Sequence, residues 1–131
     1  MLVDTNVLSE LARPMPNPRV VGWARGVPLP LSLSVVTLEE IHFGLSWRPN
    51  AEIEAWFEAF LIESCRVLPI TESIARRAGE LRGRLRGSGR QRTQDDMLIA
   101  ATAQAHQIPV ATRNVRDFDG CGIPVVNPFE D

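Results

Sequence analysis

Four carboxylates stand where they could act together as metal ligands. They lie at junctions between predicted strands and helices, and they are Asp4, Glu40, Asp96 and Asp117. In an open parallel α/β sheet, ligands bind at the carboxyl ends of the strands, near the point where strand order reverses. Like charges that meet in such a crevice repel one another unless a cation lies between them. The acids therefore predict a cation site, and an oxygen-only ligand set favours Mg²⁺ or Mn²⁺ over zinc.

Each of these acids also has a purely structural explanation. Asp4 precedes a predicted helix and could cap it, and Glu40 completes Thr37-x-x-Glu40, which is a capping box. Asp96 lies at a helix N-terminus, where the helix dipole favours acids, and Asp117 lies in a predicted turn. For any one acid the two explanations weigh about equally, so the argument for a site rests on their combination.

Two acidic doublets leave the choice of ligand open. Glu39 precedes Glu40, and Asp95 precedes Asp96. We select the second acid of each pair because of its spacing to the apolar residues that follow, and Asp95 stays the alternative to Asp96.

The histidines and cysteines do not extend this ligand set. His42 and His106 lie inside helical patterns, where a histidine is more often exposed or packed than a ligand or a base. Cys65 and Cys121 are too few and too far apart for a metal cluster or a disulfide scaffold, which favours a reducing compartment. The uncharged run 26–38 is too short and too rich in proline to span a bilayer. We therefore expect a cytoplasmic protein without a membrane segment.

The basic residues have two explanations. All 14 are arginine and none is lysine, which excludes a P-loop and other mechanisms that need a lysine. Seven fall in one window whose only acid is Glu80: Arg76, Arg77, Arg82, Arg84, Arg86, Arg90 and Arg92. They form either a solvated helix face or a phosphate-facing surface, since guanidinium groups match phosphate oxygens. The net charge of −2 gives no global field that would decide between these.

Alternating strand and helix patterns must position these residues. They indicate an α/β fold with a parallel sheet and helices on its faces. The predicted strands are 1–3, 31–36, 66–70, 108–112 and 123–126. The predicted helices are 5–12, 18–26, 37–47, 50–65, 71–86 and 93–107, with a loop at GSGR. In the fourth helix a stripe at helical spacing predicts a core face, with a homodimer surface as the alternative: Ile53, Trp56, Phe57, Phe60 and Leu61.

Four segments together resemble one family. MLVDTNVLSE, SVVTLEEIHFG, DDMLIAATA and VATRNVRDF are similar, in order and spacing, to the PIN-domain ribonucleases, and specifically to the VapC-like toxins of bacterial toxin-antitoxin pairs, including the FitB-like branch. The likeness covers the whole chain. It implies a single PIN domain over 1–131, built as a three-layer α/β/α sandwich around a mostly parallel sheet of about five strands.

The resemblance also implies an activity and a site. The family's acidic positions carry over onto the four carboxylates named above, which would hold one or two Mg²⁺ or Mn²⁺ ions in an endoribonuclease. Its supporting polar positions carry over onto Thr5, Asn6, Thr112 and Asn114. It further implies a cognate VapB-like antitoxin and a homodimer. Flanking RNA phosphates would contact basic residues near the site: Arg86, Arg90, Arg92, Arg113 and Arg116.

Other functions fit less well. An aspartyl-phosphate phosphatase normally needs a second acid two residues after the first, where this chain has Asn6. A response-regulator receiver relies on a lysine that this chain lacks, and GSGR does not follow a strand as a dinucleotide-binding loop would. The remaining alternative is a PIN-fold module that binds RNA or protein without cleaving it.

Overall fold

One parallel sheet organises the chain in the computed structural model, which describes residues 1–130. Its strands are β1 (Leu2–Val3), β2 (Leu31–Ser34), β3 (Cys65–Leu68), β4 (Val110–Ala111) and β5 (Val125–Val126). They lie in the order β3-β2-β1-β4-β5, and every neighbouring pair is parallel. The predicted five-stranded sheet is confirmed, and it is parallel throughout the described residues.

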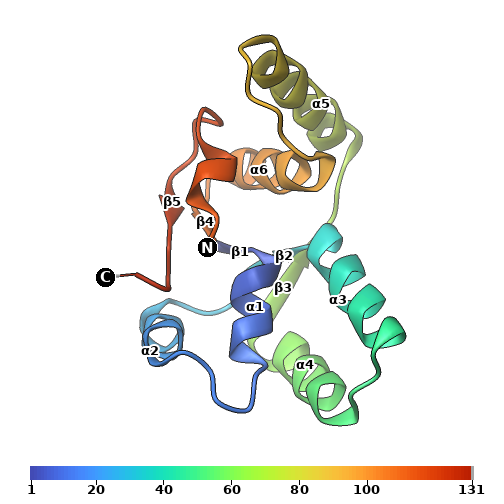
Figure 1. Ribbon diagram of the computed structural model, residues 1–131, viewed down its shortest axis with the longest axis vertical. Coiled ribbons are helices and arrows are strands. Elements are labelled where there is room, and N and C mark those ends of the chain that lie inside the picture. The colour runs from blue at the N-terminus through green and yellow to red at the C-terminus, as the bar shows by residue number, and fades with distance from the viewer. Residues whose placement is uncertain (131) are drawn as a thin grey trace.

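Helices cover both faces of this sheet. They are α1 (Thr5–Leu11), α2 (Pro18–Gly26), α3 (Val35–Trp47), α4 (Ala51–Ser64), α5 (Glu72–Gly87) and α6 (Gln94–His106), with a 3₁₀ helix, η1 (Val115–Phe118). Figure 1 shows α5 and α6 on one side of the sheet and α1, α2 and α4 on the other. The three-layer α/β/α architecture is thus confirmed.

The sheet divides the hydrophobic core into two parts. Successive strand side chains point to opposite faces, so Leu2 packs with Leu81 of α5 and Met97 of α6, whereas Val3 packs with Leu8 of α1 and Phe57 of α4. All of these side chains are buried. This alternation holds the short central strand β1 from both sides, which fixes the residues that follow it.

The predicted element boundaries need correction at several places. The second strand ends at Ser34 and not at Val36, because the Ser34 hydroxyl accepts the Val36 amide and starts α3 there. The third strand ends at Leu68. The other strands are shorter than predicted by one to three residues, and η1 lies where a simple turn was expected.

The predicted apolar stripe of α4 lies on the core. Phe57 is buried, and Trp56, Phe60 and Leu61 are partly buried against the same cluster. Ile53 is half-buried. The stripe is therefore confirmed as a core face. Among residues 1–130 we find no helix with the length and apolarity needed to span a bilayer.

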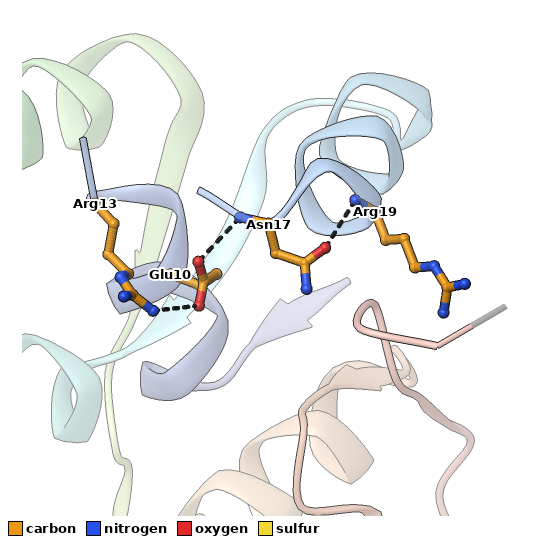
Figure 2. A network of polar contacts seen from close by, with 4 residues as sticks. All are labelled: Glu10, Arg13, Asn17 and Arg19. Carbon is orange, nitrogen blue, oxygen red and sulfur yellow. Dashed lines mark hydrogen bonds and ion pairs between the residues drawn. The ribbon is translucent and has the colours of Figure 1, made fainter. Parts of the chain in front are cut away.

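A buried acid fixes the connection between α1 and α2. Glu10 is only 8% exposed, and its two carboxylate oxygens accept from Arg13 Nη1 at 3.2 Å and from the Asn17 backbone N–H at 3.0 Å. Asn17 in turn caps α2, because its side-chain oxygen accepts the Arg19 N–H at 2.9 Å. Figure 2 shows this chain of contacts. Glu10 therefore has a structural role, because it joins the end of α1 to the start of α2.

Candidate active site

The site lies where the strand order reverses. From β1 the chain proceeds outward through β2 to β3 and then returns to β4 on the other side of β1. The carboxyl ends of β1 and β4 therefore form the switch point at which open α/β sheets bind ligands. Asp4 directly follows β1, and Thr112 directly follows β4.

Asp4 is held at this point by three hydrogen-bond donors. Its Oδ1 accepts the Thr5 backbone N–H at 2.8 Å, and its Oδ2 accepts Thr112 Oγ1 at 2.8 Å and Asn6 Nδ2 at 3.2 Å. The residue is 7% exposed. Burial raises the pKa of Asp4, the three donors oppose that shift, and the charge of Asp117 adds to it. Asp4 caps α1 and is also an oriented carboxylate at the switch point, so the two explanations do not exclude each other.

Asn6 and Thr112 connect the two sides of the switch point. Asn6 donates to Thr112 Oγ1 at 3.3 Å, and its own side-chain oxygen accepts the Arg113 N–H at 3.1 Å. Thr112 is fully buried and also accepts the Asn114 N–H at 3.0 Å. The two side chains therefore support the Asp4 carboxylate, whereas Asn114 contributes only its backbone.

Glu40 joins the site through Thr5. The Thr5 hydroxyl lies 3.2 Å from both Glu40 Oε1 and the buried Thr37 Oγ1. Because α3 begins at Val35, Thr37 is not its N-cap, and the predicted capping box does not exist. Burial raises the pKa of Glu40, Thr5 opposes the shift, and neighbouring aspartates increase it. The structural explanation for Glu40 as a helix cap is therefore wrong.

Asp96 has a strongly raised pKa. It lies in the first turn of α6, where Thr93 Oγ1 accepts its backbone N–H at 3.1 Å. Burial raises its pKa to about 6, helped by the charges of Asp4, Asp117 and Asp95. Asp95 is exposed, while Asp96 is half-buried. These differences favour Asp96 over Asp95 as the acid directed into the site.

Asp117 lies on η1, beside a hollow of about 480 Å³. Its charge raises the pKa values of Asp4 and Asp96, so it shares their electric field. Arg113 and Arg116 line the same hollow. The Arg113 guanidinium also stacks over the Phe129 ring at 4.5 Å from its centroid.

The four acids influence one another electrostatically, but among residues 1–130 they do not form a preorganised metal site. Among residues 1–130, no three His, Cys, Asp or Glu side chains already stand in an arrangement that would hold a metal ion. Burial is the main cause of the raised pKa values, and a cation would relieve the mutual repulsion that adds to it. An all-oxygen donor set of this charge fits a hard divalent ion. The assignment of the four carboxylates as metal ligands stays a prediction.

A largely apolar groove opens beside Glu40. Its volume is about 470 Å³, and it is lined by residues of α1, α3 and α4 and of the turn between α3 and α4. Thr5 and Glu40 stand in its wall, so the groove and the acidic site share two side chains. Arg48 also lines the groove.

The arginine window divides into paired and unpaired members. Arg76 contacts Glu72 at 3.5 Å, and Arg77 contacts Glu80 at 3.3 Å. Arg86 and Arg90 are exposed, and Arg92 is half-buried. Among the described residues, these three have no acidic partner within ion-pair distance, and neither do Arg82 and Arg84.

The histidines and cysteines lie as the sequence predicted, but two supporting threonines were missed. His42 and His106 are exposed, and both cysteines are free thiols. Sequence analysis missed two supporting residues, Thr37 and Thr93. Thr93 could have been recognised, since Thr93-x-x-Asp96 has the spacing of an N-cap and its N3 residue; Thr37 could not, because its role depends on where α3 begins.

The parallel sheet with carboxylates at its switch point matches a known family of proteins. The family model "PIN domain" matches residues 1–120, and the chain belongs to the PIN-domain family. Within the family it groups with the FitB and VapC toxins.

Four of the similar proteins and structures match nearly the whole of this chain. Toxin FitB of Neisseria gonorrhoeae is 34% identical over 100% of this chain and 99% of its own. VapC ribonuclease Y4jK of Sinorhizobium fredii is 34% identical over 99% of this chain and 98% of its own. The crystal structure of FitAcB from N. gonorrhoeae matches 99% of both chains with a TM-score of 0.86 and 34% identity. A toxin-antitoxin complex from Klebsiella pneumoniae matches 99% of this chain and 98% of its own with a TM-score of 0.78 and 27% identity.

Proposed function

We propose that the protein is a metal-dependent endoribonuclease and the toxin of a toxin-antitoxin pair. One observation carries the proposal: a buried, triply hydrogen-bonded Asp4 lies at the switch point of the sheet, and its charge acts on Glu40 and Asp96. The name of the VapC ribonuclease relative supports RNA as the substrate.

Each carboxylate has a distinct role in this proposal. Asp4, Glu40 and Asp96 would hold Mg²⁺ or Mn²⁺ directly or through water, and Asp117 would bind a second ion or position the attacking water. When bound, such an ion acidifies water, polarises the phosphate and orients the substrate. Since His42 and His106 are exposed and neither is part of the acidic group, the proton of the attacking water leaves through a carboxylate or to solvent.

The supporting polar residues keep this arrangement ready for substrate. Thr112 and Asn6 fix the Asp4 carboxylate, and Thr5 links Asp4 to Glu40. Because the donors are held by the ends of two strands and one helix, the carboxylate does not have to be ordered when RNA binds.

RNA would approach as a single strand or a loop. Unstacked bases and a flexible backbone can enter a crevice that a duplex cannot. Arg113 and Arg116, in the hollow beside Asp117, would contact phosphates next to the cleaved bond.

The toxin role adds two partners. The Klebsiella relative was solved as a toxin-antitoxin complex, and by analogy we propose that a VapB-like antitoxin neutralises this chain in the cytoplasm. We also propose a homodimer, as the resemblance implies. The alternative is a non-catalytic PIN-fold module that binds RNA or a partner protein.

A cleavage assay separates the two functions. Purified protein is incubated with structured RNA in Mg²⁺, in Mn²⁺ and in EDTA. We expect cleavage only with a divalent ion, a loss of about 100-fold or more for Asp4→Asn and Glu40→Gln, and full activity for the exposed neighbour variant Glu39→Gln. RNA that binds without being cut under any ion, with Asp4→Asn unchanged, would establish the non-catalytic module instead.

A further inference from the structure

A cluster of three guanidinium groups gathers around the turn that follows η1. Arg84 Nη2 donates to the Gly120 carbonyl at 3.2 Å. Arg90 lies against the same glycine, since a Cβ added to Gly120 would come within 2.5 Å of Arg90 Nη1. Arg92 lies close by, because its charge and that of Arg84 act on the thiol of Cys121. We call these three residues the Gly120 cluster.

The end of α5 holds this cluster in place. Gly89 adopts a φ of +86°, its N–H bonds Arg86 O at 3.0 Å, and the Arg90 N–H bonds Leu85 O at 2.8 Å. This pair of bonds is a Schellman motif, which reverses the chain at the helix end. Arg90 is thereby directed back toward Gly120, which itself has a φ of +82°. The approach of the two loops depends on glycine at both positions.

The cluster lacks counter-charges. Among residues 1–130, no acidic side chain lies within ion-pair distance of Arg84, Arg90 or Arg92. The Arg92 Nε is buried and has no hydrogen-bond partner. Its Nη1 reaches only the Gln91 carbonyl, at 3.4 Å. Buried N–H groups are normally paired, so this donor indicates a missing acceptor.

The position of the cluster relates it to the acidic site. Burial raises the pKa of the Cys121 thiol, Arg92 and Arg84 oppose the shift, and the charges of Asp96 and Asp119 add to it. Cys121 Sγ also lies 3.9 Å from Sδ of Met97, the residue after Asp96, so the turn that carries Gly120 contacts the start of α6. A polyanion that approaches the acids meets repulsion, and nearby cations without an acidic partner offset that repulsion.

We propose that the Gly120 cluster is a phosphate-binding subsite for the RNA strand, adjacent to Asp96. This inference rests on the proposed ribonuclease function and assigns one side of the substrate path to Arg84, Arg90 and Arg92. Guanidinium groups bind phosphate oxygens through charge-assisted hydrogen bonds, and the side chains of Arg84 and Arg90 are exposed to an approaching strand. Arg76 and Arg77, paired on the exposed part of α5, take no part.

Binding measured without cleavage tests the subsite. A short, fluorescently labelled, single-stranded oligoribonucleotide of mixed sequence is titrated with the protein in EDTA over a series of salt concentrations. We expect Arg90→Gln combined with Arg92→Gln to weaken binding by about tenfold or more. The slope of log affinity against log salt should become shallower by about 0.7 for each RNA phosphate that the variant no longer neutralises.

Three further variants sharpen the result. Arg76→Gln, which removes a paired arginine of the same helix, should change neither affinity nor slope, and Arg90→Lys with Arg92→Lys should recover most of the slope. If the double variant unfolds, Arg90→Gln alone serves, since that side chain is exposed. If the folded variants bind RNA with unchanged affinity and slope, the subsite proposal is wrong. It is equally wrong if these variants bind RNA normally but bind a partner protein more weakly. Because the titration does not depend on cleavage, failure of the ribonuclease proposal is detected separately in the Mg²⁺ assay.

Discussion

At the scale of single residues, the site depends on how a buried carboxylate is kept ionised. Asp4 is 7% exposed, and burial opposes its charge. Thr112, Thr5 and Asn6 each donate to it and offset that penalty. A carboxylate satisfied in this way can face a cation without a large rearrangement, because its orientation is fixed by residues at the ends of two adjacent strands.

Removal of the Thr112 hydroxyl tests this support. Thr112→Val leaves Asp4 Oδ2 with only the Asn6 donor, so we expect the free energy of unfolding to fall by about 2 kcal/mol. The pKa of Asp4 should rise further. Urea unfolding at neutral pH measures the effect. Thr102→Val is the matched control, because that buried hydroxyl donates only to the Leu98 carbonyl of its own helix, at 2.7 Å; equal losses in both variants would contradict the role given to Thr112.

The raised pKa values predict how stability depends on pH. The folded protein binds protons at Asp96 more tightly than the unfolded chain does, since the pKa rises from 3.8 to about 6. Asp4 and Glu40 shift in the same direction. The free energy of unfolding in EDTA should therefore decrease as the pH rises from about 4 through about 6, and then level off.

Thermal melting at a series of pH values measures this dependence. Asp96→Asn should flatten the profile and raise the melting temperature above pH 6, because the variant carries no charge to repel. Glu52→Gln, on the exposed face of α4, should leave the profile unchanged. A wild-type protein that becomes more stable as the pH rises through this range would contradict the burial and mutual repulsion of the acids.

At the scale of elements, the prediction failed where a cap depends on tertiary contacts. The pattern LSLSVV and the spacing Thr37-x-x-Glu40 both favoured a helix starting at Thr37. In the structure the buried Ser34 hydroxyl caps α3 three residues earlier. Val35 and Val36 suit a strand or a helix almost equally, so local preference could not set this boundary. The longer helices were predicted within about two residues, because their periodicity extends over several turns.

Sequence analysis named candidate residues for the site, but it did not predict the contacts between them. Residues that follow strands can be found from sequence, and this is how Asp4 was selected, whereas Thr112 was selected through the family resemblance. The link from Thr5 to Glu40 could not be found in this way, because it joins α1 to α3 across 35 residues. The influence of the Asp95 charge on the pKa of Glu40 could not be found from sequence either, because it depends on how α6 is placed relative to α3.

The connection between α1 and α2 gives a prediction at this scale. In Glu10→Gln one acceptor oxygen is replaced by an amide donor facing Arg13 or the Asn17 N–H. We expect a loss of about 1–2 kcal/mol in the free energy of unfolding, measured in urea. The exposed substitution Glu54→Gln should have little effect. Reduced Mn²⁺ affinity in Glu10→Gln without reduced stability would show that the acid serves the site and not the α1–α2 connection.

At the scale of the whole molecule, the topology explains why distant residues meet. The order β3-β2-β1-β4-β5 places β1 at the centre, so residues after β1 and β4 meet at one edge although 108 positions separate Asp4 from Thr112. Asp96 and Asp117 belong to the α6 side of the sheet and Glu40 to α3. The acidic field is therefore a property of the assembled fold and is lost on unfolding.

Calorimetric titration with Mn²⁺ tests the central claim that these acids form one cation site. The wild-type protein should bind Mn²⁺ saturably and melt at a higher temperature when it is loaded. Asp4→Asn and Asp96→Asn should each weaken that binding strongly, while Asp95→Asn should retain it. Equal effects of Asp95→Asn and Asp96→Asn, or no saturable binding by the folded wild-type protein, would contradict the account.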